Sequence, residues 1–297
     1  MRLEDLLAKA QRIELKSRYL ARSHYAGLYL SAFKGQGLEF ADVREYSEGD
    51  DMRLIDWNVS ARSQSLHVKK MVEERERNVL VLLDTSGSLA FGSIRRTKYD
   101  LIVELASLLV LSGFLARDRV SLALFRQRVN LFIPPAKGWN HAARLIREMV
   151  SGVPAGSFQA MEPVWTFLNS PGVPRSLVFL FTDFEVPLAA SNSLSISARK
   201  HEIVAILVSD PREWSLPAVG RIRLEDPETM EARVVNTNLP SIRLEYEQTA
   251  ARKKKEVLSI LGANRVDWAD FSTGSDYAVP LRQFLESRAL RRGYRRP

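Results

Sequence analysis

The chain has 297 residues, of which 45% are hydrophobic and 26% charged, with a formal net charge of +8 and no cysteine. This length and balance are typical of a globular protein with two domains, or with one large domain and an extension. The absence of cysteine excludes disulfides and thiolate metal sites, and the four histidines lack ligand spacing, so a catalytic zinc site is not expected.

Targeting signals and nucleic-acid motifs are also missing from the sequence. The amino terminus mixes acidic and basic residues, unlike a secretory signal. The longest apolar stretch, 105–116, is shorter than the roughly 18 residues that a membrane span needs. The positive charge gathers in 252–255 and in a tail over 288–297, with no recognised nucleic-acid module. We therefore expect a cytoplasmic protein with no transmembrane segment and no specific nucleic-acid partner.

Residues 1–77 are predicted to form a helical and β-rich elaboration. Apolar residues recur at helical spacing in its first twenty residues, and short strand and turn patterns follow. In chain order, the predicted elements are a helix over 3–21, an apolar segment over 26–33 joined by a turn to a strand over 38–46 that returns antiparallel, a short helix over 54–61, and a strand over 66–72.

From residue 78 onward, strand and helix patterns alternate, which predicts a mostly parallel sheet between helices. The predicted strands begin at residues 78, 120, 129, 176, 203 and 265. The predicted helices cover 95–116, 139–150, 160–168, 191–200, 241–261 and 277–287. Residues 221–235 are predicted to form a hairpin. We therefore predict an α/β fold, a Rossmann-like, doubly wound and mostly parallel sheet over 78–287, followed by the basic tail.

An apolar run over 79–83, in the strand that begins at residue 78, delivers one carboxylate and two hydroxyls, Asp84, Ser86 and Ser88, onto a tight turn. Such a run is typical of a strand buried on both faces, and open α/β sheets bind ligands at the carboxyl ends of their strands. A second apolar strand ends at Asp183. Carboxylate and hydroxyl oxygens suit a hard cation such as Mg²⁺, so the pattern predicts a metal site. The same residue types also form turns that cap helices.

The spacing D-x-S-x-S resembles the metal-ion-dependent adhesion site of von Willebrand factor type A domains, which implies a domain of that type over 78–287. That resemblance implies that Ser86 and Ser88 bind Mg²⁺ or Mn²⁺ directly, while Asp84 and Asp183 act largely through water. It also implies a hydroxyl ligand from an intervening loop, where Ser157 stands in place of the usual threonine.

Residues 37–62, GLEFADVREYSEGDDMRLIDWNVSAR, are similar to the hallmark of domain-of-unknown-function family 58, bacterial proteins associated with MoxR-type AAA+ ATPases. Segments 208–213 and 226–229 extend the resemblance over most of the chain. It implies a partnership with a MoxR-type ATPase in chaperone-like or maturation work on client proteins. The metal would capture a carboxylate of the partner.

The charged residues of this hallmark have two interpretations. They could form an acidic metal site or a general acid/base pair, or they could be the salt bridges and turn caps of the β-rich segment. No nucleophile or nucleotide motif lies nearby, which favours the second interpretation. The residues are Asp50, Asp51, Arg53, Asp56 and Arg62, and Asp56 with Trp57 also fits a docking surface.

We assign no catalytic role from the sequence. It has no G-x-x-x-x-G-K-[ST] phosphate loop, and Ser86 stands where a haloacid dehalogenase-type nucleophile would have its second aspartate. Two alternatives remain open. One is a metal- or aspartate-dependent hydrolase at Asp84 and Asp183. The other is an electrostatic binder of nucleic acid or membrane that works through the basic tail.

Overall fold

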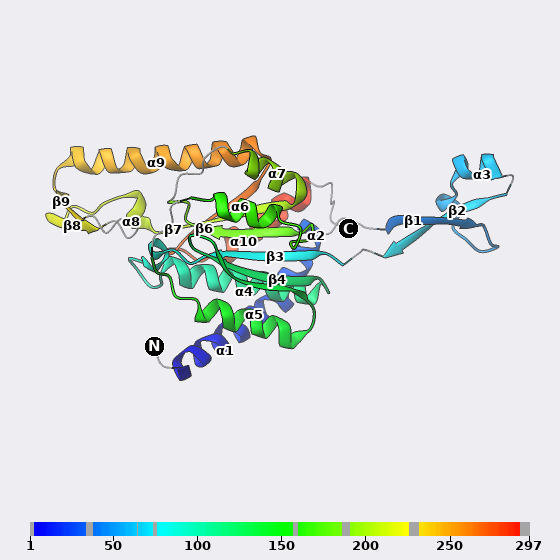
Figure 1. Cartoon of the computed structure of the whole chain (residues 1–297), viewed down its shortest axis with the longest axis horizontal. Coiled ribbons are helices and arrows are strands. Elements are labelled where there is room, and N and C mark those ends of the chain that lie inside the picture. Colours follow the sequence, from blue (N-terminus) through cyan, green and yellow to red (C-terminus); the bar gives the residue numbers. More distant parts are fainter. Residues whose placement is uncertain are drawn as a thin grey trace.

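A six-stranded sheet lies between two layers of helices (Figure 1). The computed structural model describes residues 3–33, 38–63, 65–73, 76–156, 160–185, 191–225 and 232–291. The sheet has the order β10-β7-β6-β3-β4-β5, and its neighbours are parallel except for β4 and β5. The strands are β3 (Asn78–Asp84), β4 (Arg119–Phe125), β5 (Val129–Ala136), β6 (Leu177–Thr182), β7 (Glu202–Ser209) and β10 (Asp267–Ser272).

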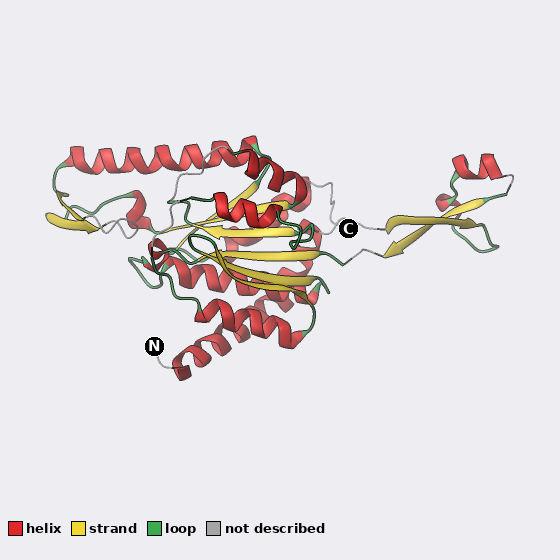
Figure 2. Cartoon of the chain, viewed as in Figure 1, coloured by secondary structure: helices red, strands yellow, loops and turns green. Residues whose placement is uncertain are grey.

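Helices cover both faces of this sheet (Figure 2). The first face is covered by α1 (Leu3–Leu20), α2 (Ala26–Phe33), α4 (Lys98–Leu115), α5 (Trp139–Ser151) and α10 (Ala278–Arg291). The second face is covered by α6 (Glu162–Asn169), α7 (Asn192–Lys200) and α9 (Pro240–Ala263). Successive side chains of a strand point to opposite faces, so β3 supplies Val81 to the first core and Leu82 to the second. This is a mixed α/β fold of Rossmann-like type, as predicted.

Two smaller units extend from opposite ends of the sheet (Figure 1). At one end, β1 (Leu38–Glu45) and β2 (His67–Glu73) form an antiparallel ribbon that carries η2 (Met52–Leu54) and α3 (Trp57–Ser63). At the other end lie α8 (Pro211–Trp214) and the hairpin of β8 (Arg221–Glu225) and β9 (Ala232–Asn236). The predicted turn of that hairpin, 226–229, lies outside the described residues.

The segment 26–33 differs from its prediction. It was expected in a strand-rich section beside 38–46, but it is helix α2, and β1 pairs with β2 instead. Tyr29 and Phe33 are four residues apart and therefore share a helix face. Both are buried against Phe179, with ring centroids 6.4 and 5.1 Å from its ring. A strand would send its side chains to alternate faces and could not pack both rings in this way.

Two element boundaries also follow from tertiary contacts. Strand β5 continues through Pro134 and Pro135, which an edge strand tolerates because one side of its backbone has no neighbour. The first four residues of the predicted tail, 288–291, complete α10 because Arg288 is buried and forms ion pairs with Asp267 and Glu202. No helix in the described ranges is both long and apolar enough to span a bilayer.

Candidate functional site

The two predicted strand-end carboxylates lie at one edge of the sheet. Strands β3 and β6 are parallel neighbours, β3 ends at Asp84, and Asp183 directly follows the end of β6. The chain leaves β3 toward β4 on one side and returns to β6 on the other, which makes this edge a topological switch point. Open α/β sheets bind their ligands in the crevice at such a point.

Asp84 is fully buried and both of its oxygens accept hydrogen bonds. The backbone N–H of Ser86 donates to Oδ1 over 2.8 Å, and Thr182 Oγ1 donates to Oδ2 over 2.8 Å. Burial, together with the nearby negative charge of Asp183, raises the pKa of Asp84 to about 7. The carboxylate is therefore fixed in place and electrostatically unfavourable without a compensating cation.

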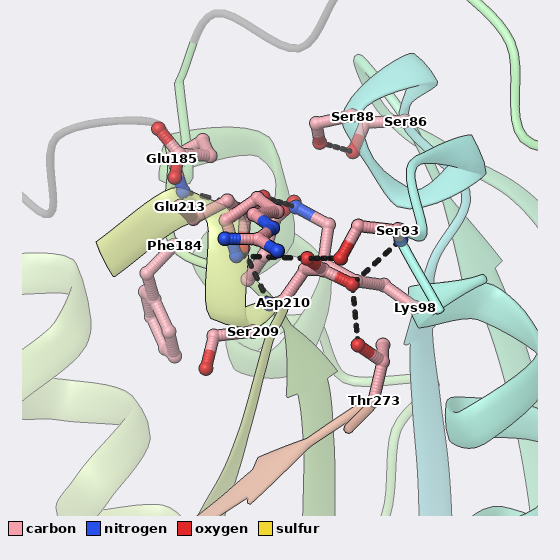
Figure 3. Close-up of polar contacts among 12 residues, drawn as sticks. Ser86, Ser88, Ser93, Lys98, Phe184, Glu185, Ser209, Asp210, Glu213 and Thr273 are labelled. Atoms are coloured by element: carbon pink, nitrogen blue, oxygen red, sulfur yellow. Dashed lines mark hydrogen bonds and ion pairs between the residues drawn. The ribbon is translucent and has the colours of Figure 1, made fainter. Parts of the chain in front are cut away.

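The turn after β3 presents two hydroxyls side by side (Figure 3). The oxygens Ser86 Oγ and Ser88 Oγ are 3.1 Å apart, and both residues are buried. The backbone N–H of Gly87 donates to the carbonyl of Gly156 over 2.9 Å, which holds the loop before Ser157 against this turn. Ser157 itself lies outside the described residues.

The turn after β6 has an unusual backbone. Phe184 has a φ of 53°, a left-handed conformation that is uncommon for an aromatic residue. Its N–H donates to Thr182 Oγ1 over 3.2 Å, and the same hydroxyl donates to Asp84. The turns that follow β3 and β6 are therefore joined through one threonine hydroxyl.

Lys98, in the first turn of α4, forms a cluster of charged side chains with Asp183 and Glu213. The sequence patterns did not predict this lysine. Its fully buried Nζ lies 2.7 Å from Asp183 Oδ2 and also donates to Glu213. Burial by itself would lower the pKa of Lys98, but the two carboxylates outweigh burial and raise it above its ordinary value. The available signal was a lysine at the first position of a helix whose second half is apolar.

Asp210 and Glu213 connect this cluster to helix α8. Asp210 is the N-cap of α8, and Glu213 accepts a hydrogen bond from its backbone N–H over 2.7 Å, which forms a capping box. The carboxylate of Asp210 also accepts hydrogen bonds from Ser93 and Thr273 (Figure 3). The short helix α8 is thus tied to the loop before α4 and to the end of β10.

The donor set at this edge fits a small hard cation. Among the described residues, no three His, Cys, Asp or Glu side chains cluster as a metal site, so an ion here would depend on hydroxyl oxygens. The 3.1 Å between the two serine oxygens matches the separation of about 3 Å expected for adjacent ligands of an octahedral Mg²⁺ with bonds of about 2.1 Å. Charge also favours an ion, because Asp183 and Glu213 share the one ammonium group of Lys98, and the negative charge of Asp183 also acts on Asp84.

Two members of the charged cluster of residues 50–62, Asp50 and Asp56, have structural contacts. Asp50 forms two hydrogen bonds with Arg44, of 2.6 and 2.7 Å, and accepts a third from the backbone of Ser47. Asp56 accepts from the backbone N–H groups of Asn58 and Val59 at the start of α3. These contacts support the interpretation as salt bridges and turn caps.

A large, mostly apolar groove begins at the candidate metal site. It has a volume of about 1170 Å³ and runs from Ser88 and Asp183 past α8 to the space between the β8–β9 hairpin and α9. We refer to it as the α9 groove. Its position makes the two predicted site residues part of a surface that is large enough for a protein segment.

Comparisons with known proteins place the chain in a family. The family described as "Protein of unknown function DUF58" matches residues 42–256. The chain is 28% identical to the uncharacterized protein Rv1480 of Mycobacterium tuberculosis over 290 residues, which cover 97% of this chain and 90% of the relative. It is 25% identical to the uncharacterized protein MAV169 of Mycobacterium avium over 162 residues, 54% of this chain and 94% of the relative.

Among solved structures, the conserved hypothetical protein BatB from Bacteroides thetaiotaomicron aligns with a TM-score of 0.43 and 16% identity, covering 72% of this chain and 99% of that chain. The family match covers well over half of the sequence. The chain therefore belongs to the family described as protein of unknown function DUF58.

Proposed function

We propose that this protein is a metal-dependent protein-binding module that captures a carboxylate of its partner at the sheet edge. The observation that carries the proposal is the pair of buried hydroxyls, Ser86 and Ser88, 3.1 Å apart beside the strand-end aspartates. They lie at the topological switch point, where sheets of this kind bind ligands.

The residues of the site have distinct roles in this proposal. Ser86 and Ser88 would hold the ion directly, Asp84 and Asp183 would act largely through water, and Ser157 would add a hydroxyl. A bound Mg²⁺ or Mn²⁺ would supply an electrophilic position for a Glu or Asp carboxylate. Asp84 also fixes the serine turn through the N–H of Ser86.

Lys98 supports the capture of an anion at this position. Its ammonium neutralises Asp183 at 2.7 Å, so fewer uncompensated protein charges would repel an incoming carboxylate. The contribution is strong because both side chains are buried, where charges are poorly screened by solvent.

We infer that the partner is a MoxR-type AAA+ ATPase and that the work is chaperone-like or concerned with the maturation of client proteins. Membership of the family, together with the hallmark at 37–62, supports this part of the proposal. The ligand that the partner supplies to the metal would then be an acidic side chain on the surface of the ATPase.

We assign no catalytic role to the site. A nucleophilic carboxylate needs an oxygen directed at its substrate, but both oxygens of Asp84 are engaged by Ser86 and Thr182 in a fully buried position. The purified protein is expected to hydrolyse phosphate esters and nucleotides no faster than a double Asp84→Ala, Asp183→Ala variant. A turnover that is lost in the double variant would favour the hydrolase instead.

Calorimetric titration of chelator-treated protein with Mg²⁺ or Mn²⁺ tests the metal site. We expect one binding site, its loss in Asp84→Ala, and at least a tenfold weaker affinity in Ser88→Ala, because the loss of even an outer-shell partner of a metal site costs about 10–100-fold in affinity. Ser93→Ala is the matched control, because the Ser93 hydroxyl contacts Asp210 rather than the serine turn. Equal binding by wild type and Asp84→Ala would reject the proposal.

A further inference from the structure

We propose that the α9 groove binds an amphipathic helix of a partner protein, with its apolar face in the groove and an acidic residue directed at Ser88. The acidic contact rests on the proposed function, whereas the fit of the helix rests on the groove itself. The groove is continuous with the metal site, since Ser88 and Asp183 form its inner end. Figure 3 shows Ser88 across from Phe184 and Glu213, which line the same space.

The groove offers faces of side chains rather than a strand edge. On the hairpin wall, Ile222 and Leu224 of β8 and Val235 of β9 line it, and the alternate positions show that one face of the hairpin is turned inward. An extended peptide satisfies its backbone by pairing with a strand edge, whereas a helix satisfies its own backbone and packs side chains against a face. The geometry therefore favours a helical ligand.

Both walls of the groove are built from elements with little support of their own. Strands β8 and β9 pair only with each other among the described strands, and an isolated two-stranded hairpin is marginally stable in water. The opposite wall is α9, which has 24 residues but buries only Val257 and Leu261. Its groove-lining residues include Tyr246 and Ala250, upstream of that buried end. A ligand that covers both faces would stabilise them.

The size of the groove suits a protein segment. Pockets for small molecules typically enclose about 300–1,000 Å³, and this groove exceeds that range at about 1170 Å³. A helix treated as a cylinder about 10 Å wide that rises about 1.5 Å per residue fills this volume with roughly ten residues. A ligand helix of about three turns is therefore expected.

The charges around the groove favour an acidic ligand. Each carboxylate that lines it already faces a cation. These pairs are Asp183 and Glu213 with Lys98, Glu185 with Lys253, Glu225 with Arg223, and Asp270 with Lys254. The exposed guanidinium of Arg212 also lines the groove and has no ion-pair or hydrogen-bond partner within the described part of the chain. Arg212 therefore offers an ion-pair partner to an acidic residue of the ligand.

A selection experiment with the full-length protein tests this inference. A phage-displayed library of 14-residue helical peptides is selected on wild-type protein in Mg²⁺, and the affinities of the enriched peptides are measured by fluorescence anisotropy. We expect apolar residues at helical spacing together with an Asp or Glu. Failure to enrich peptides of this pattern would overturn the inference.

Matched variants locate the binding surface. Val235→Asp places a charge in the groove, whereas Val234→Asp places it on the outward face of the same strand, where Val234 is 70% exposed. A second pair on α9, Ala250→Glu and the exposed Ala251→Glu, replaces the first if Val235→Asp does not fold. We expect at least a tenfold loss of affinity in the groove variant of each pair and no loss in its control. Equal affinities within both pairs would overturn the inference.

Chelation separates this inference from the proposed function. If the groove variants bind the peptide more weakly than their controls but EDTA and Ser88→Ala leave peptide binding unchanged, the groove assignment holds. The metal-mediated acidic contact is then rejected. If the protein binds Mg²⁺ as expected but the groove variant and its control bind the peptide equally well in both pairs, the groove assignment is rejected. The proposed function is then unaffected. If peptide binding is lost both in the groove variants and on removal of the metal or of the Ser88 hydroxyl, the full proposal is supported.

Discussion

The ammonium nitrogen of Lys98 lies 2.7 Å from an oxygen of Asp183, and both side chains are almost completely excluded from solvent. The ion pair thus places a fixed positive charge at the edge of the sheet where a metal cation is proposed. Removing one partner of a buried pair leaves an uncompensated buried charge, which is far more costly than the loss of an exposed pair.

We therefore expect Lys98→Met to lower the free energy of unfolding by about 3–5 kcal/mol in metal-free buffer. Urea denaturation of both proteins measures the change. Lys9→Met is the matched control, because the Lys9–Asp100 pair is partly exposed on both sides and is expected to contribute less than about 1 kcal/mol. Comparable losses in the two variants would contradict a special role for the buried pair.

The same variant tests whether Lys98 and a metal ion compete for Asp183. Without the ammonium, Asp183 and Asp84 face each other with less compensation, so a divalent cation should bind more tightly. We expect Mg²⁺ to raise the midpoint of thermal unfolding of Lys98→Met more than that of wild type. If Mg²⁺ stabilises wild type and leaves the variant unchanged, Lys98 supports the ion rather than competing with it.

His201 provides a pH-dependent test of the second core. Its Nδ1 accepts from the backbone of Ser176, so Nε2 carries the proton and donates to the carbonyl of Leu168 over 2.8 Å. Burial, with further help from Lys200 and Arg175, lowers the pKa of His201 below its ordinary value of 6.5. The unfolded chain therefore binds the proton more readily, and the stability contributed by neutral His201 is lost as the pH falls below about 6.5.

We expect His201→Gln to be less destabilising at pH 5.5 than at pH 7.5, because the wild type loses its advantage on protonation. Urea denaturation of both proteins at the two pH values measures this difference. An equal difference in unfolding free energy at both pH values would show that His201 does not titrate with folding.

Local patterns predicted the sheet and the ends of its strands well, because a strand buried on both faces reveals itself as a continuous apolar run. Asp84 and Asp183 follow such runs directly. Helix α2 was not predicted because an apolar and aromatic segment can form a helix or a strand. Its helical geometry depends on packing against Phe179, which is far away in the sequence.

Lys98 was missed for a related reason. Its partners Asp183 and Glu213 are 85 and 115 residues away, so no local spacing links the three groups. The α9 groove likewise combines β7, α8, the β8–β9 hairpin and α9, which become neighbours only in the folded chain. Patterns along the chain thus predicted the serine turn but not the charges and the surface that surround it.

The proposed partnership makes a prediction about the basic carboxyl terminus. A MoxR-type ATPase from the same organism should bind the full-length protein in a pull-down assay, and chelation or Asp183→Ala should weaken that binding. Residues 292–297 are the appropriate deletion, since Arg288 is buried and paired with Asp267 and Glu202 within α10. Exposed charges beyond a screening length of about 8 Å interact weakly at physiological ionic strength. The deletion should therefore leave a metal-mediated complex largely intact. A complex that is lost on this deletion and unaffected by chelator would move the interface to the terminal arginines and contradict carboxylate capture.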